Sequence, residues 1–196
     1  MFGSQAFLMN KQSKINRGFF SSIMYAFSNL DASINEQIKL RNKESQLLPL
    51  LYFTCLILLL SQLIEVTSQV QEAPYLSVVT AVVVSYLFFL PIFMYALSFI
   101  LYFVLKTFGA VASNFQTRLA LFWSLTLSTL IILCTSVLKV FMSGLIEAIF
   151  VVLTELVIVY IFSRILSFAS NLKKRNLFTI VITSIYFIPV ILINVS

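Results

Sequence analysis

The stretch YLSVVTAVVVSYLFFLPIFMYALSFILYFVL, residues 75–105, decides the fold of this chain. It contains no charged residue and a single proline, Pro91, near its middle. As a straight α-helix it would extend about 46 Å, whereas the hydrocarbon core of a bilayer is about 30 Å thick. The stretch therefore crosses a membrane either once, as a kinked or tilted helix, or twice, with a turn at Pro91.

The chain as a whole has the composition of a membrane protein. Hydrophobic residues make up 60% of the 196 residues and charged residues 10%, and the mean hydropathy is +1.02. A soluble domain carries about 25% charged residues. Further apolar runs cover 47–64, 119–142, 145–163 and 177–193. These runs predict an all-α, polytopic bundle of transmembrane helices in one domain, 47–196, preceded by an amino-terminal segment, 1–46.

The distribution of basic residues decides between one crossing and two. With one crossing the chain has five spans, and twelve of its thirteen lysines and arginines fall on one side, in the amino-terminal segment and the loops 106–118 and 164–176. With two crossings the sides hold seven and six, and no bias remains. Cytoplasmic loops carry an excess of Lys and Arg. The sequence therefore predicts one kinked crossing, a cytoplasmic amino end and a carboxyl end outside.

The amino-terminal segment has the periodicity of an amphipathic helix. Its large apolar residues recur at steps of three and four: Phe20, Ile23, Phe27, Leu30, Ile34 and Ile38. Other faces carry polar residues, among them Ser22, Asn29 and Gln37. A helix of this kind on the basic side is typical of one that lies in the membrane interface. The alternative is that its apolar stripe packs on the cytoplasmic ends of the other helices or on a partner.

Glu155 is the ionisable residue placed deepest within a predicted span. Counted from Leu145 it lies about 15 Å into the bilayer, where an ionised carboxylate is costly. The same count predicts a polar centre at this height, formed with Ser128, Thr129, Tyr86 and Ser184. This centre would bind a proton or a ligand group, or Glu155 would be a protonated carboxyl that only joins helices; the sequence leaves both readings open.

Other polar and aromatic residues are predicted at the membrane surfaces. One set of basic residues is expected to contact anionic lipid: Lys39, Arg41, Lys43, Lys173, Lys174 and Arg175. Trp123, next to Phe122 and close to Arg118, is expected to anchor its helix at the interface. Lys139 and Glu147 flank a short turn and are expected to pair there. No set of residues typical of catalysis, of cofactor binding or of a metal site occurs, and in so apolar a chain the basic excess does not indicate nucleic acid.

One block, PIFMYALSFILYFVLKTFGAVASNFQTRLALFWSLTLSTL, residues 91–130, resembles bacterial members of the Yip family. An apolar helix is followed by a loop with Gly109 and the tripeptide SNF, and then by Gln116 and Arg118 at the start of the next helix. The five-span layout of that family matches residues 46–193. The chain differs from many family members in having no proline between Arg118 and Met142.

The resemblance implies a function without catalysis. Eukaryotic members of the Yip family are Golgi and endoplasmic-reticulum proteins that bind Rab-type GTPases and shape or sort membranes, and the family has no catalytic residues to carry over. The expectation is a non-enzymatic protein that organises membrane, or a membrane complex, through its amphipathic helix and basic loops. The alternatives are a small transporter or channel with Glu155 on its path, and an accessory or assembly subunit of a membrane complex.

Location and partners follow from the same features. A cleavable leader is not expected, because the first long apolar run begins near Leu47. With the compact size and the bacterial-type resemblance, this favours a bacterial inner membrane. The expected partners are an anionic lipid bilayer and either another membrane protein or a second copy of the chain.

Overall fold

The computed structural model describes residues 18–69, 75–172 and 175–195. Within these ranges the chain forms helices and no strand, so the predicted all-α fold is confirmed. The helices are α2 (Phe19–Ser28), α3 (Leu30–Leu40), α4 (Leu48–Gln69), α5 (Tyr75–Val84), α6 (Leu90–Thr107), α7 (Asn114–Lys139), α8 (Leu145–Ala169) and α9 (Arg175–Val195).

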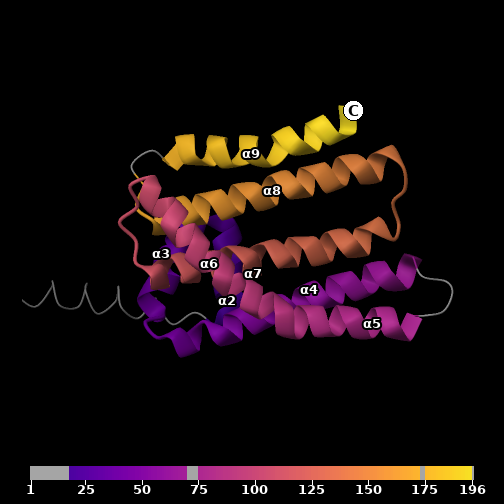
Figure 1. Ribbon diagram of the computed structural model, residues 1–196, viewed down its shortest axis with the longest axis horizontal. Coiled ribbons are helices and arrows are strands. Elements are labelled where there is room, and N and C mark those ends of the chain that lie inside the picture. Colours follow the sequence, from indigo (N-terminus) through magenta and orange to yellow (C-terminus); the bar gives the residue numbers. More distant parts are fainter. Residues whose placement is uncertain (1–17, 70–74, 173–174, 196) are drawn as a thin grey trace, which may run out of the picture.

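Among the described residues, four helical segments are long and apolar enough to cross a membrane. They are Glu44–Thr67, Leu76–Thr107, Asn114–Lys139 and Leu145–Ala169, and they coincide with the first four predicted spans. The fifth predicted span, 177–193, lies within α9, which packs along α8 (Figure 1). The chain is thus a helical bundle compatible with an integral membrane protein, and five crossings stay a prediction.

The stretch around Pro91 forms one continuous, bent helix, as predicted. α5 and α6 are joined by a π-helical turn at Ser85–Phe89, in which the backbone N–H of Leu90 donates to the carbonyl of Ser85. Pro91 has no N–H for the carbonyl one turn earlier, and its ring crowds that carbonyl. A π-turn is a usual cause of a helix bend. The bend between α5 and α6 is visible in Figure 1.

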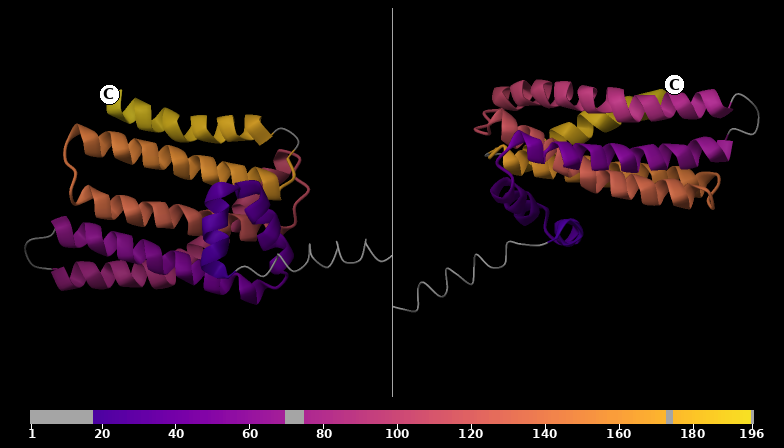
Figure 2. Two further views of the ribbon diagram at one scale, coloured as in Figure 1. Left: turned by 180° about the vertical axis from the view of Figure 1, so that it is seen from behind. Right: turned by 90° about the horizontal axis from the view of Figure 1, so that it is seen from below.

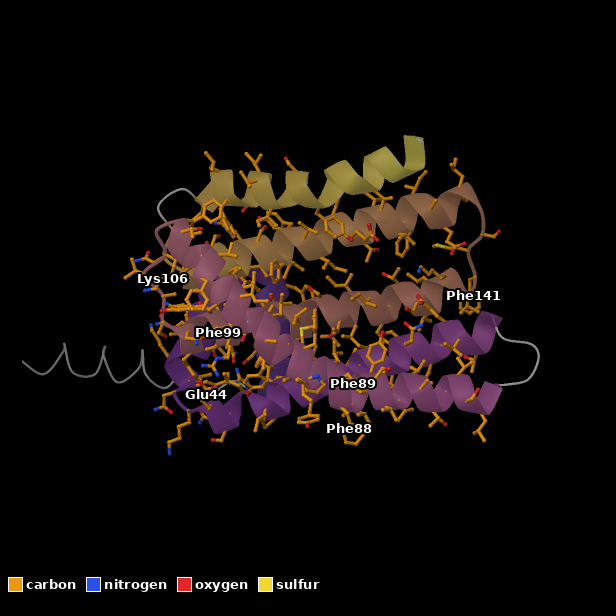
Figure 3. The ribbon with its side chains drawn as sticks, in the orientation of Figure 1. Glu44, Phe88, Phe89, Phe99, Lys106 and Phe141 are labelled. Carbon is orange, nitrogen blue, oxygen red and sulfur yellow. The ribbon has the colours of Figure 1, made fainter. Side chains whose placement is uncertain are left out.

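The loops that carry the basic residues meet at one end of the bundle. Successive long helices run in opposite directions, so α6 ends and α7 begins beside the α8–α9 connection (Figure 1). In Figure 3, Glu44 and Lys106 lie at this end and Phe141 at the other. We call it the basic end; its described basic residues are Lys39, Arg41, Lys43, Lys106, Arg118, Arg164 and Arg175. Lys139, the last residue of α7, lies toward the opposite end.

Helices α7 and α8 extend farther into the basic end than the sequence predicted. Arg118 and Arg164, expected in loops, are both helical. α7 begins early because Ser113 and Gln116 form a capping box: the Ser113 Oγ accepts from the Gln116 N–H at 3.2 Å, and the Gln116 Oε1 accepts from the Ser113 N–H at 3.0 Å. Gly109, with φ +78°, ends α6 in the left-handed conformation that glycine adopts without strain.

Helix α7 forms the centre of the bundle and packs against α4, α6 and α8. Its Phe122, Trp123 and Leu127 have no exposed surface. The Thr126 and Thr54 Oγ1 atoms lie 3.0 Å apart and join α7 to α4. Small hydroxyl side chains allow close approach of helices and hydrogen bonds between them, as is usual in membranes.

The structure corrects the prediction that Trp123 anchors its helix in the lipid interface. The Trp123 side chain is fully buried, and its Nε1–H donates to the Ser33 Oγ at 2.8 Å. The Arg41 guanidinium lies 5.8 Å from the centre of the indole ring. A buried indole N–H needs an acceptor, which here comes from α3. Trp123 therefore anchors α3 to the bundle.

The predicted amphipathic helix over Phe20–Ile38 is divided into two helices, α2 and α3, in the structure. Asn29 breaks it: its backbone is extended, and its side chain caps α3 by accepting the Ala32 N–H at 3.0 Å. The break also divides the predicted stripe, since Ile23 and Ile34 are buried while Phe20 and Phe27 are exposed. Two residues expected on a wet face, Ser22 and Gln37, are buried.

Candidate functional site

A cavity of about 310 Å³ opens between α4, α7, α8 and α9. Its polar lining consists of Glu65, Thr135, Ser136, Lys139, Thr154, Glu155 and Tyr186, and its apolar lining of Ile132, Val151, Ile158 and Val159. Both sets follow helical spacing: positions 132, 135, 136 and 139 form one face of α7, and positions 151, 154, 155, 158 and 159 one face of α8. Two adjacent antiparallel helices thus turn a mixed face toward each other.

Glu155 lies in the wall of this cavity. The sequence predicted Glu155 near the middle of the bilayer, in a polar centre inside the bundle. In the structure its side chain lines a cavity large enough for a small ligand. Among the described residues, no lysine or arginine forms an ion pair with Glu155. Hydroxyl groups lie in the same wall, those of Thr154 on its own helix and Tyr186 on α9.

Lys139 of α7 forms an ion pair with Glu65 of α4. The sequence had instead predicted a pair with Glu147 across the turn. The Lys139 Nζ donates to the Glu65 Oε1 at 3.2 Å, and the Ser136 Oγ donates to the same oxygen at 3.2 Å. Lys139 ends α7, where a cation also interacts favourably with the helix dipole. Each side chain of the pair is 30% exposed, so the pair lies at the rim of the cavity that faces away from the basic end.

A second polar contact closes the wall between α7 and α8. The hydroxyl oxygens of Thr135 and Thr154 lie 3.2 Å apart. This contact fixes the register of the two helices on either side of the cavity, because it joins residues from the lining face of each.

The other predicted members of the polar centre do not line this cavity. Ser128 and Thr129 are buried within the bundle, and the Thr129 hydroxyl donates to the Thr126 carbonyl at 3.1 Å. Tyr86 donates to the Gln62 Oε1 at 3.3 Å and lines a separate, mostly apolar hollow between α4 and the bent helix. Ser184 is exposed. Counting residues gives the depth of a side chain but not the side of the helix on which it lies. The residues of the predicted polar centre therefore lie in different parts of the bundle.

Sequence reasoning missed Glu65, Ser136 and Tyr186. Lys139 was expected to pair with Glu147 at a turn, and Glu65, just after the apolar run 47–64, was not considered as its partner. A signal was present: Thr135, Ser136 and Lys139 continue the helical face that begins at Ile132. That signal indicates a polar face on α7 but does not identify the helix that supplies its partner.

At the basic end, α3 is held to the bundle by charge. The carboxylate of Asp31 accepts from the Arg164 Nε at 3.0 Å and Nη2 at 2.8 Å, a bidentate pair, and the Arg175 Nη1 lies 4.0 Å away. Such paired, charge-assisted bonds are stronger than single neutral ones. The Arg118–Glu44 pair, at 3.1 Å, has the more exposed carboxylate: the Glu44 side chain is 50% exposed, against 26% for Asp31.

The basic residues predicted to contact lipid have different environments. Lys39 and Lys43 are exposed. Arg41 is partly buried over Trp123, and burial lowers its pKa from the ordinary value, since a low dielectric disfavours the charged form. Arg175 stacks on Phe168, with 4.6 Å from its guanidinium carbon to the ring centre. Lys173 and Lys174 lie outside the described residues.

Helix α2 presents an apolar surface beside these charges. Phe20, Met24 and Phe27 are 72%, 71% and 47% exposed, and we call them the α2 patch. Figure 2 shows that α2 and α3 run crosswise to the long helices, at the level where those helices reach the basic end.

The part of the chain that the structure describes contains no group of three or more His, Cys, Asp or Glu side chains that could hold a metal ion. Comparison of the chain with family models, with curated proteins and with solved structures gives no match.

Proposed function

We propose that this chain is a non-enzymatic integral membrane protein of the Yip type, which organises membrane or a membrane-protein complex through its amino-terminal helices and basic end. The observation that carries the proposal is the α2 patch. A strongly exposed aromatic and Met surface marks a membrane or protein contact, and this one is held in a fixed place because α3 is tied to the bundle by Asp31 and Trp123.

The direction of α2 supports an interfacial role. When the long helices stand across a bilayer, helices crosswise to them lie parallel to its plane. Exposed Lys39 and Lys43 lie at and just beyond the end of α3, where anionic headgroups would attract them. The proposed partners are therefore anionic lipid and a membrane protein or second copy that contacts the α2 patch. Nucleic acid is not among them.

For the topology we propose five crossings in a bacterial inner membrane, with the basic end and the amino end in the cytoplasm and the carboxyl end outside. The gathering of the basic residues at one end supports this orientation through the positive-inside rule. The length and apolar composition of α9 support the fifth crossing.

Cysteine labelling tests this orientation. In a chain with Cys55→Ala and Cys134→Ala, a membrane-impermeant maleimide should modify Phe141→Cys in intact spheroplasts and Val111→Cys only after lysis. Both positions are well exposed, at 83% and 78%, so a lack of reaction reports sidedness. Reaction of Val111→Cys in intact spheroplasts would overturn the orientation. Reporters fused at Met1 and Ser196 should lie in opposite compartments, and a shared compartment would exclude five crossings.

Crosslinking in native membranes tests the organising role. A lysine-reactive crosslinker should join Lys39 and Lys43 to a recurrent membrane-protein neighbour identified by mass spectrometry. The triple change Phe20→Ser, Met24→Ser, Phe27→Ser should abolish these crosslinks, because it removes the apolar contact but leaves α3 attached. Val111→Ser, an equally exposed position at the same end, is the control and should change nothing. Crosslinks that survive the triple change would refute a role for the α2 patch.

A second candidate function, a small transporter or channel, is favoured by the cavity at Glu155. It differs from the organising role in one measurable property: purified protein in liposomes would move protons or a solute, and this flux would require Glu155. Stoichiometric presence in a large complex would instead favour an accessory subunit.

A further inference from the structure

We propose that the cavity between α4, α7, α8 and α9 binds a small amphiphilic organic cation, an amine with an apolar body, on the carboxylate of Glu155. The inference rests on the cavity itself and not on the organising role proposed above. It requires binding only, and would stand whether or not the chain moves a solute.

The charges of the lining favour a cation. Glu65 and Lys139 form an ion pair that balances their charges, and the Ser136 hydroxyl donates to the same Glu65 oxygen. Glu155 is the remaining charged group in the lining, and no described lysine or arginine forms an ion pair with it. When Glu155 is ionised, the cavity carries one uncompensated negative charge in surroundings of low dielectric. Glu155 is partly buried, and a carboxylate withdrawn from water is stabilised by a partner of opposite charge.

The shape and the apolar lining favour an organic cation over an inorganic one. A volume of about 310 Å³ is at the lower end of the range for small-molecule sites, about 300–1,000 Å³. Ile132, Val151 and Ile158 offer hydrocarbon contact to a body of one ring. A bare metal ion prefers a shell of oxygen ligands, and the described residues hold no group of three candidate ligands. The Thr154 and Tyr186 hydroxyls can accept bonds from an ammonium group.

The rim shows the side from which the ligand enters. Glu65 lies near the carboxyl end of α4 and Lys139 ends α7, so the partly exposed pair marks the end of the bundle opposite the basic end. The cavity then continues inward to Glu155, about ten residues into α8. An amine would pass the ion pair and meet Glu155 with its body against the apolar residues.

Three probes of the same size separate charge from shape: benzylammonium, benzyl alcohol and benzoate. With the full chain in lipid nanodiscs, equilibrium dialysis of labelled probes should show benzylammonium bound about tenfold or more tightly than benzyl alcohol, and benzoate bound least, because the ammonium group alone forms a charge-assisted bond with the carboxylate. Glu155→Gln should remove the preference for benzylammonium and leave the affinity for benzyl alcohol unchanged. Glu147→Gln, the same change in the first turn of the same helix, does not line the cavity and should behave as wild type.

A second variant keeps the inference testable if Glu155→Gln does not fold, which thermal unfolding in nanodiscs would show. Val151→Phe fills the cavity without changing charge and should weaken binding of benzylammonium and benzyl alcohol alike. Equal affinity for the three probes would mean an apolar pocket of the kind a lipid chain occupies, and would overturn the inference. So would an absence of benzylammonium binding, or binding that Glu155→Gln leaves unchanged.

Discussion

Trp123→Ala should destabilise the folded chain by about 3–5 kcal/mol, the range for truncating a large buried aromatic residue. The indole is fully buried between α7 and α3, makes an edge contact with Phe19 at 6.5 Å between ring centres, and donates a hydrogen bond to Ser33. Its loss leaves a void and an unpaired hydroxyl, and it removes a main attachment of α3. Reversible unfolding in lipid or mild detergent measures the change in free energy.

Two controls separate packing from the loss of an aromatic ring. Phe88→Ala, at a side chain 66% exposed on the bent helix, should change stability by less than about 0.5 kcal/mol, because that ring would face lipid in the folded and unfolded states. Trp123→Phe retains much of the packing and loses the hydrogen bond, so its effect should be intermediate. A Trp123→Ala effect as small as that of Phe88→Ala would contradict the buried position of the indole.

Asp31→Ala should cost about 1–3 kcal/mol and release α3 from the bundle. The change removes both bonds to Arg164 and leaves a partly buried guanidinium, of which 31% of the side chain is exposed, without its carboxylate. It also removes the acidic residue in the first turn of α3, where a negative charge is favourable. Hydrogen exchange should show faster exchange of the amides in 30–40, with the long helices unaffected.

Glu44→Ala is the matched control for Asp31→Ala. It removes a carboxylate from another arginine pair at the same end, Arg118–Glu44. This Glu44 side chain is 50% exposed, and the pair is joined by a contact of 3.1 Å, whereas Asp31 and Arg164 form two hydrogen bonds. Its loss should cost no more than about 1 kcal/mol. A double-mutant cycle with Arg164→Ala isolates the coupling, and a coupling near zero would refute the bidentate pair as the tie that holds α3.

Of the residues that line the cavity, the sequence identified Glu155 but not the polar residues around it. Glu155 was identified because a carboxylate in an apolar helix is costly and few such residues occur. Ser128, Thr129 and Tyr86 were grouped with it by depth, yet they do not line the cavity that Glu155 lines. Lys139, the cation that balances Glu65, is 74 residues away in sequence, beyond α5 and α6 and at the far end of α7. Pairing of this kind depends on how helices rotate about their axes, which a count along the chain does not contain.

The sequence by itself determined the helical fold, the single bent helix at Pro91 and the gathering of basic loops at one end. Each of these follows from local rules: runs of apolar residues, the missing N–H of proline and the number of long helices between the charged loops. Only the tertiary structure decided that Asn29 divides the amino-terminal segment, that Trp123 is covered by α3 and that Glu155 faces a cavity. These depend on which faces of separate helices meet, and packing and paired polar groups fix that choice after the helices have formed.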